Sequence, residues 1–144
     1  MHPDSIHEFL TKNGFIYTSE AFKGRSDFKT SVTLKNAQYQ VSIHMDTRRH
    51  FFAVYAHAPL IVSETLHADL LKLIAEANWG QEIARFELNP KSGEFRCAAT
   101  AYLPDSHLSM TMVKGMMDFT LEWLDAFFPA LVELERTSIP SGKY

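Results

Sequence analysis

Seven histidines and a single cysteine are the residues of this chain best suited to binding a metal or attacking a substrate. A zinc site needs ligands at short, regular intervals, such as His-x-x-x-His or Cys-x-x-Cys. Neither spacing occurs in the sequence. His44 and His50 flank one turn, but strand alternation is expected to place them on opposite faces of a hairpin. The sequence therefore predicts no metal site and no cofactor.

Covalent catalysis would require a serine or cysteine held beside a base. The Gly-x-Ser-x-Gly elbow of hydrolases is absent from the sequence. Cys97 lies in a run of small residues, on the strand face shared with Phe95 and Leu103, which indicates a buried packing thiol. Acidic residues are scattered singly, and no glycine-rich phosphate loop occurs. These patterns predict a protein that is not an enzyme.

Composition excludes several further classes of protein. The chain is 46% apolar and 22% charged, as in an ordinary soluble domain. No apolar run reaches the roughly 18 residues of a membrane span, and the start of the chain lacks the pattern of a signal peptide. A lone cysteine cannot form an internal disulfide, so we expect a cytoplasmic protein.

The most basic stretch, Arg48-Arg49-His50, is followed by two phenylalanines, as at a nucleic-acid-binding surface. A solvated turn that keeps a sheet soluble has the same composition. The net charge of −3 and the absence of an RNP-like motif argue against nucleic acid as a partner, and the mixed charges argue against an anionic membrane.

Two kinds of periodicity divide the chain into elements. Alternation of apolar and polar residues predicts strands over 28–34, 39–45, 51–58, 83–88 and 95–103. A helical period predicts helices from a capping box at Ser5 to about Gly14, from the N-cap Ser63 to Ala77, and from about Ser106 past Phe128. The polar residues 18–27 are expected to form a loop, and Pro59 to close the third strand. The order α-β-β-β-α-β-β-α predicts a single α+β domain over 1–144, with helices packed on an antiparallel sheet.

The last predicted helix is more apolar than one buried face requires. One stripe of large side chains comprises Met112, Met116, Phe119, Trp123 and Phe127. A second stripe comprises Met110, Val113, Met117, Leu121, Leu124 and Phe128. Together they cover roughly 200° of the helix, against about 100° for a single buried face. Either both stripes are core or one meets another chain. We expect the second stripe to form the interface of a homodimer, with the first packed on the sheet.

Two short stretches resemble a known fold: Gly14-Phe15 after the first helix, and Ala77-Asn78-Trp79-Gly80 before the second hairpin and the long apolar helix. With this order of elements, the chain resembles the type III secretion chaperone-like fold and, within it, the bacterial YbjN-type proteins described as candidate sensory-transduction regulators. The resemblance spans nearly the whole chain. It implies one α+β domain with a strongly curved antiparallel sheet, often dimeric. Secretion chaperones of this fold hold an unfolded stretch of a client along apolar patches, and no catalytic residue is implied.

We therefore expect a non-enzymatic, homodimeric protein-binding module, chaperone-like or regulatory, with a protein or peptide client. The alternative is a small-molecule-binding domain or small enzyme with a pocket in the concavity of the sheet. Its candidate residues are the polar groups that interrupt the strands: Tyr39, His57, Arg85 and Tyr102. For Arg85, an ion pair with Glu87 on the outer face is the simpler expectation. A third possibility is an accessory subunit that is stable only with a different protein.

Overall fold

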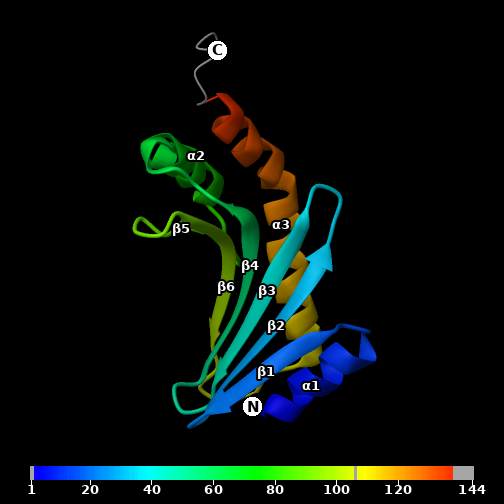
Figure 1. Cartoon of the computed structure of the whole chain (residues 1–144). Helices are drawn as coiled ribbons and strands as arrows, with labels where there is room; N and C mark the ends of the chain where they lie inside the picture. Colours follow the sequence, from blue (N-terminus) through cyan, green and yellow to red (C-terminus); the bar gives the residue numbers. More distant parts are fainter. Residues whose placement is uncertain (1, 106, 138–144) are drawn as a thin grey trace.

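Six strands make one antiparallel sheet in the computed structural model, which describes residues 2–105 and 107–137 (Figure 1). Four strands follow one another as a meander: β1 (Tyr17–Phe22), β2 (Arg25–Thr33), β3 (Gln38–Asp46) and β4 (Phe51–Ile61). The hairpin of β5 (Arg85–Leu88) and β6 (Glu94–Tyr102) completes the sheet. Because β6 pairs with β4, the strand order is β1-β2-β3-β4-β6-β5.

Three α-helices accompany the sheet. The longest, α3 (Met110–Thr137), lies across one face and contacts β4 and β6 (Figure 1). α1 (Pro3–Lys12) packs against α3 near the β1 end, whereas α2 (His67–Asn78), preceded by the 3-10 turn η1 (Glu64–Leu66), packs against β5. The predicted α+β class, with helices on an antiparallel sheet, is confirmed.

The structure corrects the prediction of a loop over 18–27, where β1 and the start of β2 form a hairpin. β1 pairs with β2 from Tyr17↔Thr30 to Phe22↔Arg25. Its two-residue turn, Lys23-Gly24, has positive φ at both positions, 45° and 83°, as tight hairpins require. β1 lies at the sheet edge with nearly all its side chains exposed, so it shows no apolar alternation. Backbone pairing, and not burial, creates this strand.

Several element boundaries also differ from the prediction. α1 begins at Pro3, and the ring Nδ1 of His2 accepts the backbone N–H of Asp4 as its cap, so Ser5 is not the capping residue. β4 continues through Pro59 to Ile61, because an irregularity in its pairing with β6 after His57 accommodates the proline. The expected start of the last helix, Ser106, lies outside the described residues, and α3 begins at Met110.

The residues expected to form a dimer interface lie in the core of the chain itself. Phe128 is 9% exposed and Met110 is half-buried. The other four side chains are at most 5% exposed: Val113, Met117, Leu121 and Leu124. This corrects the expectation, because a side chain already covered within one chain has no surface left for a second. The other stripe is divided. Met116 is buried, Trp123 and Phe127 pack on Phe86, and Phe119 is partly exposed.

We predict that Leu124→Ala will lower the free energy of unfolding by about 2–5 kcal/mol, because Leu124 is fully buried between α3 and the sheet. Urea denaturation checks this value. Val132→Ala, at an exposed site of the same helix, is the matched control and should change stability by about 0.5 kcal/mol or less. Equal effects at the two sites would contradict the assignment of this stripe to the core.

Candidate functional site

The face of the sheet opposite α3 carries the polar side chains of all the strands. Its residues stand in rows, because the antiparallel register places Gln40 beside both Ser31 and His57, and His57 beside Arg96. The next row includes Lys29, Ser42 and Tyr55. We call this surface the open face. It is where polar and ionisable groups converge in the described chain.

His57 and Ser42 form the one arrangement on the open face that resembles a nucleophile and its base. Ser42 Oγ lies 3.1 Å from His57 Nε2. Burial and the positive charge of Arg96 lower the pKa of His57, which keeps the ring neutral. Acyl transfer also needs free N–H donors beside the nucleophile. Ser42 instead lies in the middle of β3, which is paired on both sides. The pair is suited to hydrogen-bonding a ligand, not to forming an acyl-enzyme.

A second polar cluster lies nearer the hairpin turns. Asp27 accepts hydrogen bonds from His44 Nδ1 and from Arg25 Nε, the latter at 3.3 Å. Burial alone would raise the pKa of Asp27, but the hydrogen bond from His44 and the nearby Arg25 outweigh it and hold the pKa below its ordinary value. The carboxylate is therefore ionised at neutral pH and orients both partners.

Arg96 links the centre of the open face to its β5 edge. Its guanidinium lies over the ring of Tyr55, 3.9 Å from the ring centroid, and its Nε donates to Glu87 at 2.7 Å. Arg85 donates to the other oxygen of Glu87 at 3.0 Å, so the ion pair expected for Arg85 is present. Burial opposes the ionisation of Glu87, but the two arginines together lower its pKa.

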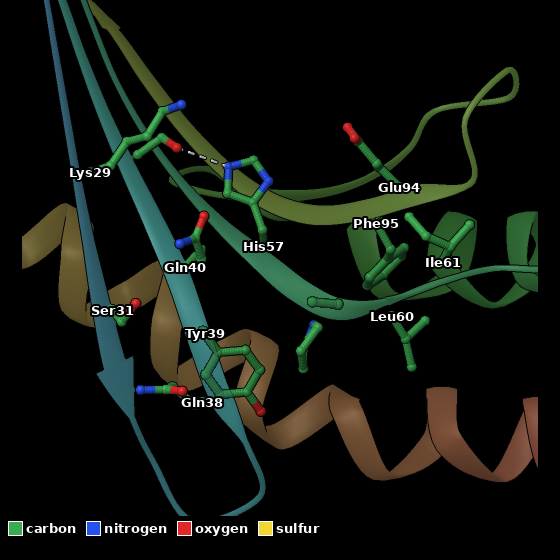
Figure 2. A pocket seen from close by; sticks show the side chains of 13 residues that line it. Lys29, Ser31, Gln38, Tyr39, Gln40, His57, Leu60, Ile61, Glu94 and Phe95 are labelled. Atoms are coloured by element: carbon green, nitrogen blue, oxygen red, sulfur yellow. Dashed lines mark hydrogen bonds between the residues drawn. The ribbon is translucent and has the colours of Figure 1, made fainter. Parts of the chain in front are cut away.

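A trough crosses the open face near the bend of β4 (Figure 2). It has a volume of about 670 Å³, and its floor consists of the amides and hydroxyls of Ser31, Gln38, Gln40 and Ser42, with His57 on one side. A neighbouring hollow of about 560 Å³ is also lined by Ser31, Gln38 and Gln40, shares Lys29 with the trough, and extends to the start of β1. The combined trough therefore runs from Ile16, which is 93% exposed, to Ile61, which is also exposed.

The two edges of the sheet differ in how their backbone groups are used. At the β5 edge, the side chain of Asn78 donates to the carbonyl of Phe86 at 3.0 Å and accepts its N–H at 2.8 Å. This amide occupies the positions that another strand would use. At the other edge, no described residue pairs with the outer side of β1. Thus β5 is closed against strand addition and β1 is open to it.

The residues proposed for a small-molecule pocket are not brought together. Tyr39 is buried on the opposite face, where its hydroxyl donates to Asp125 at 2.6 Å, and burial together with this carboxylate raises its pKa. Arg85 is engaged by Glu87, and Tyr102 is exposed at the far end of the open face. Of the four, Tyr39 and His57 line the trough (Figure 2), but Tyr39 is fully buried, so His57 alone offers it an accessible side chain.

Other reactive groups offer little chemistry. Cys97 is fully buried, and burial raises the pKa of its thiol to about 12, so the thiolate is not available at neutral pH. Within residues 2–105 and 107–137, no group of three His, Cys, Asp or Glu side chains is placed to bind a metal ion. None of the described helices has the length and hydrophobicity needed to cross a membrane.

Comparison with solved structures identifies a similar fold. A chain of the HopA1–SchA chaperone–effector complex superposes with a TM-score of 0.58, over 86% of this chain and 90% of that one. The chain has a type III secretion chaperone-like fold. Sequence identity is 16%, so the likeness concerns the fold alone. No protein-family model matches the chain. No curated protein matches it either.

Within this chaperone-like fold, sequence reasoning found some of the site and missed the rest. Arg85, Tyr102 and His57 were identified as polar interruptions of strands, and all three lie on the open face. The free edge of β1 does not follow from the sequence, because the exposed residues of β1 have the polar composition of a loop. The bonds by which Asn78 blocks the outer edge of β5 do not follow from the sequence either, although Asn78 lies in the Ala77–Gly80 stretch that resembles the fold. An asparagine at a helix end beside a short strand is the signal that could have indicated it.

We predict that stability will fall more steeply with acidification in the wild type than in His57→Gln. The pKa of His57 is lowered by folding, so the unfolded chain, with its ordinary value near 6.5, takes up a proton first. Protonation then favours the unfolded state as the pH falls through that value. Glutamine can keep a hydrogen bond to Ser42 without titrating. Urea denaturation at several pH values between about 8 and 5 measures both slopes. Identical slopes would contradict a half-buried, neutral His57.

Proposed function

We propose that this chain is a non-enzymatic protein-binding module that holds an extended segment of a client protein at the free edge of its sheet. The observation that carries the proposal is the contrast between the two edges. Asn78 blocks β5, whereas the outer side of β1 offers its backbone N–H and C=O groups. Strand addition at such an edge gives affinity through the main chain and tolerates varied client sequences.

The trough supports the same proposal. It begins beside β1, at Ile16, Tyr17 and Thr18, so a client strand paired with β1 would reach it at one end. Its amide and hydroxyl floor can hydrogen-bond a peptide backbone, and the exposed Ile16 and Ile61 can anchor apolar client side chains. The fold it shares with a chain of the HopA1–SchA chaperone–effector complex agrees with a client of this kind.

Within this function, a chaperone and a YbjN-type regulator are the two specific roles that we propose. Both require a client or partner protein, and both fit the free β1 edge. We place the protein in the cytoplasm, since its one cysteine is buried and free.

We further propose that the protein is a homodimer, formed through an exposed face of α2 and not through α3. This face carries Leu71 and, at the end of the helix, Trp79, which is 88% exposed. The small side chain of Ala75 lies between them, and that of Ala68 lies one turn before Leu71. A lone protein rarely leaves such a tryptophan in water. The alanines would let a second helix approach closely while Leu71 and Trp79 of each copy fill the space beside them.

Charge complementarity favours a second copy as the partner of α2. Lys72 and Glu76 lie one turn apart beside the apolar face, and neither forms an ion pair with a described residue. When two such helices pack antiparallel about a two-fold axis, Lys72 of each copy lies opposite Glu76 of the other. The same patch is therefore complementary to itself.

A small-molecule-binding domain is the second candidate function. The trough volume of about 670 Å³ lies within the range of small-ligand sites, and His57 offers a ring nitrogen beside its bond to Ser42. Its open shape and polar floor fit an extended peptide better than an enclosed metabolite.

For the client site, we predict that one of two adjacent variants, Ser19→Pro and Glu20→Pro, will abolish binding without loss of stability. Neighbouring strand residues direct their N–H groups to opposite sides, so one substitution removes a donor from the free edge and the other removes a bond to β2. The probe is reduced, carboxymethylated α-lactalbumin, which is permanently unfolded, and binding is read by hydrogen exchange of the β1 amides. The edge-facing variant should keep the wild-type melting temperature. Wild-type binding by both variants would overturn the proposal.

For the dimer, we predict that Leu71→Asp will convert a dimer to a monomer, because it places two carboxylates in the apolar centre of the interface. Light scattering across a range of concentrations gives the mass. Phe22→Asp, at an exposed site on β1, is the matched control and should leave the dimer intact. Lys72→Glu should weaken the dimer, and the double variant with Glu76→Lys should restore it. A wild-type monomer at every concentration would refute the α2 interface.

A further inference from the structure

A second hollow on the open face is lined by three arginines. It lies near the hairpin turns, has a volume of about 250 Å³, and is separate from the trough, with which it shares no lining residue. Arg25 comes from β2, Arg49 from the β3–β4 turn and Arg96 from β6. Three segments distant in sequence therefore bring guanidinium groups to one place.

Many of the donors of these arginines are unused. Arg25 donates through Nε to Asp27 and its Nη2 lies 3.4 Å from His44 Nδ1, while Arg96 donates through Nε to Glu87. The side chain of Arg49 has no hydrogen-bond partner within residues 2–105 and 107–137. A guanidinium has five N–H donors in a planar fork that matches a carboxylate or phosphate.

The acidic groups near the hollow are already engaged. Asp46, the one carboxylate in its lining, accepts the backbone N–H groups of Arg48 and Arg49 through Oδ1, each at 3.1 Å. Asp27 is held by His44 and Arg25, and Glu87 by Arg85 and Arg96. No carboxylate is paired with the guanidinium of Arg49, so positive charge in the hollow is incompletely neutralised.

The walls of the hollow are aromatic. Phe51 and Tyr55 line it from the same strand, two positions either side of the fully buried Ala53. Ala53 itself is fully buried, and the Arg96 guanidinium lies over the Tyr55 ring, 3.9 Å from its centroid. The partly exposed ring of Phe51 is therefore the aromatic surface that remains open to a ligand. The hollow of about 250 Å³ therefore has an apolar wall beside its three arginines.

We propose that this hollow binds a small aromatic oxyanion, with the ring packed against Phe51 and the carboxylate or phosphate on Arg25, Arg49 and Arg96. The site is independent of the β1 edge and of the α2 interface. This hollow would give a protein-binding domain a separate site for a small molecule.

The test uses phenyl phosphate, benzoate, inorganic phosphate and benzyl alcohol as probes, with binding to the full chain measured by calorimetry. We expect phenyl phosphate and benzoate to bind, inorganic phosphate to bind at least about tenfold more weakly, and benzyl alcohol not to bind. Arg49→Gln should weaken phenyl phosphate about tenfold or more, since it removes the unpaired guanidinium. Phe51→Ala should remove the preference for phenyl phosphate over inorganic phosphate, because it removes the apolar wall while retaining all three arginines.

Arg48→Gln is the matched control, because the Arg48 side chain lies against Gly24, away from the lining of the hollow. It should bind phenyl phosphate as the wild type does. The melting temperature of each variant confirms that it is folded. Equal loss of binding in Arg48→Gln and Arg49→Gln would overturn the proposal, because binding would then depend on net positive charge and not on the arginines that line the hollow. Equal affinities for inorganic and phenyl phosphate, or no binding of either aromatic anion, would overturn it as well.

Discussion

Helix α3 carries large apolar side chains around most of its circumference, and these must be covered within the chain. β4 and β6 cover it along much of its length, and α1 packs against it near the β1 end. Val113, Leu124 and Leu131 have no exposed surface as a result. One face of the sheet and α1 therefore belong to the core. The other face of the sheet is in contact with water, so its side chains must be largely polar.

The open face meets this requirement through pairs of polar groups that span neighbouring strands. Asp27 joins Arg25 and His44, and Glu87 joins Arg85 and Arg96. Such partly exposed pairs contribute little stability individually. They do fix the positions of long side chains over a sheet that no helix orders. A surface held in this way can present defined hydrogen-bond donors, which is the condition for both the trough and the arginine-lined hollow.

The sequence predicted the parts of the fold that burial determines. The alternation of Tyr39, Val41, Ile43 and Met45 identified β3, because each of these side chains is buried on one face. β1 could not be found in this way, since its pairing is made by backbone groups and its side chains are exposed on both faces. The apolar width of α3 was evident, but not whether the sheet or a second chain covers it. That distinction depends on the curvature of β4 and β6, which no local pattern specifies.

The positions of the proposed surfaces determine how they can act together. α2 lies beside β5, at the edge of the sheet opposite β1 (Figure 1). A dimer formed through α2 would therefore leave both β1 edges free, one on each copy. Two sites on one particle raise the effective concentration of a second client segment once the first is bound, provided that the client can span them. A client with two extended segments would be held far more tightly than its contacts with either copy alone allow. Closure of β5 by Asn78 fits this arrangement, because an open edge beside the dimer interface would compete for the same segments.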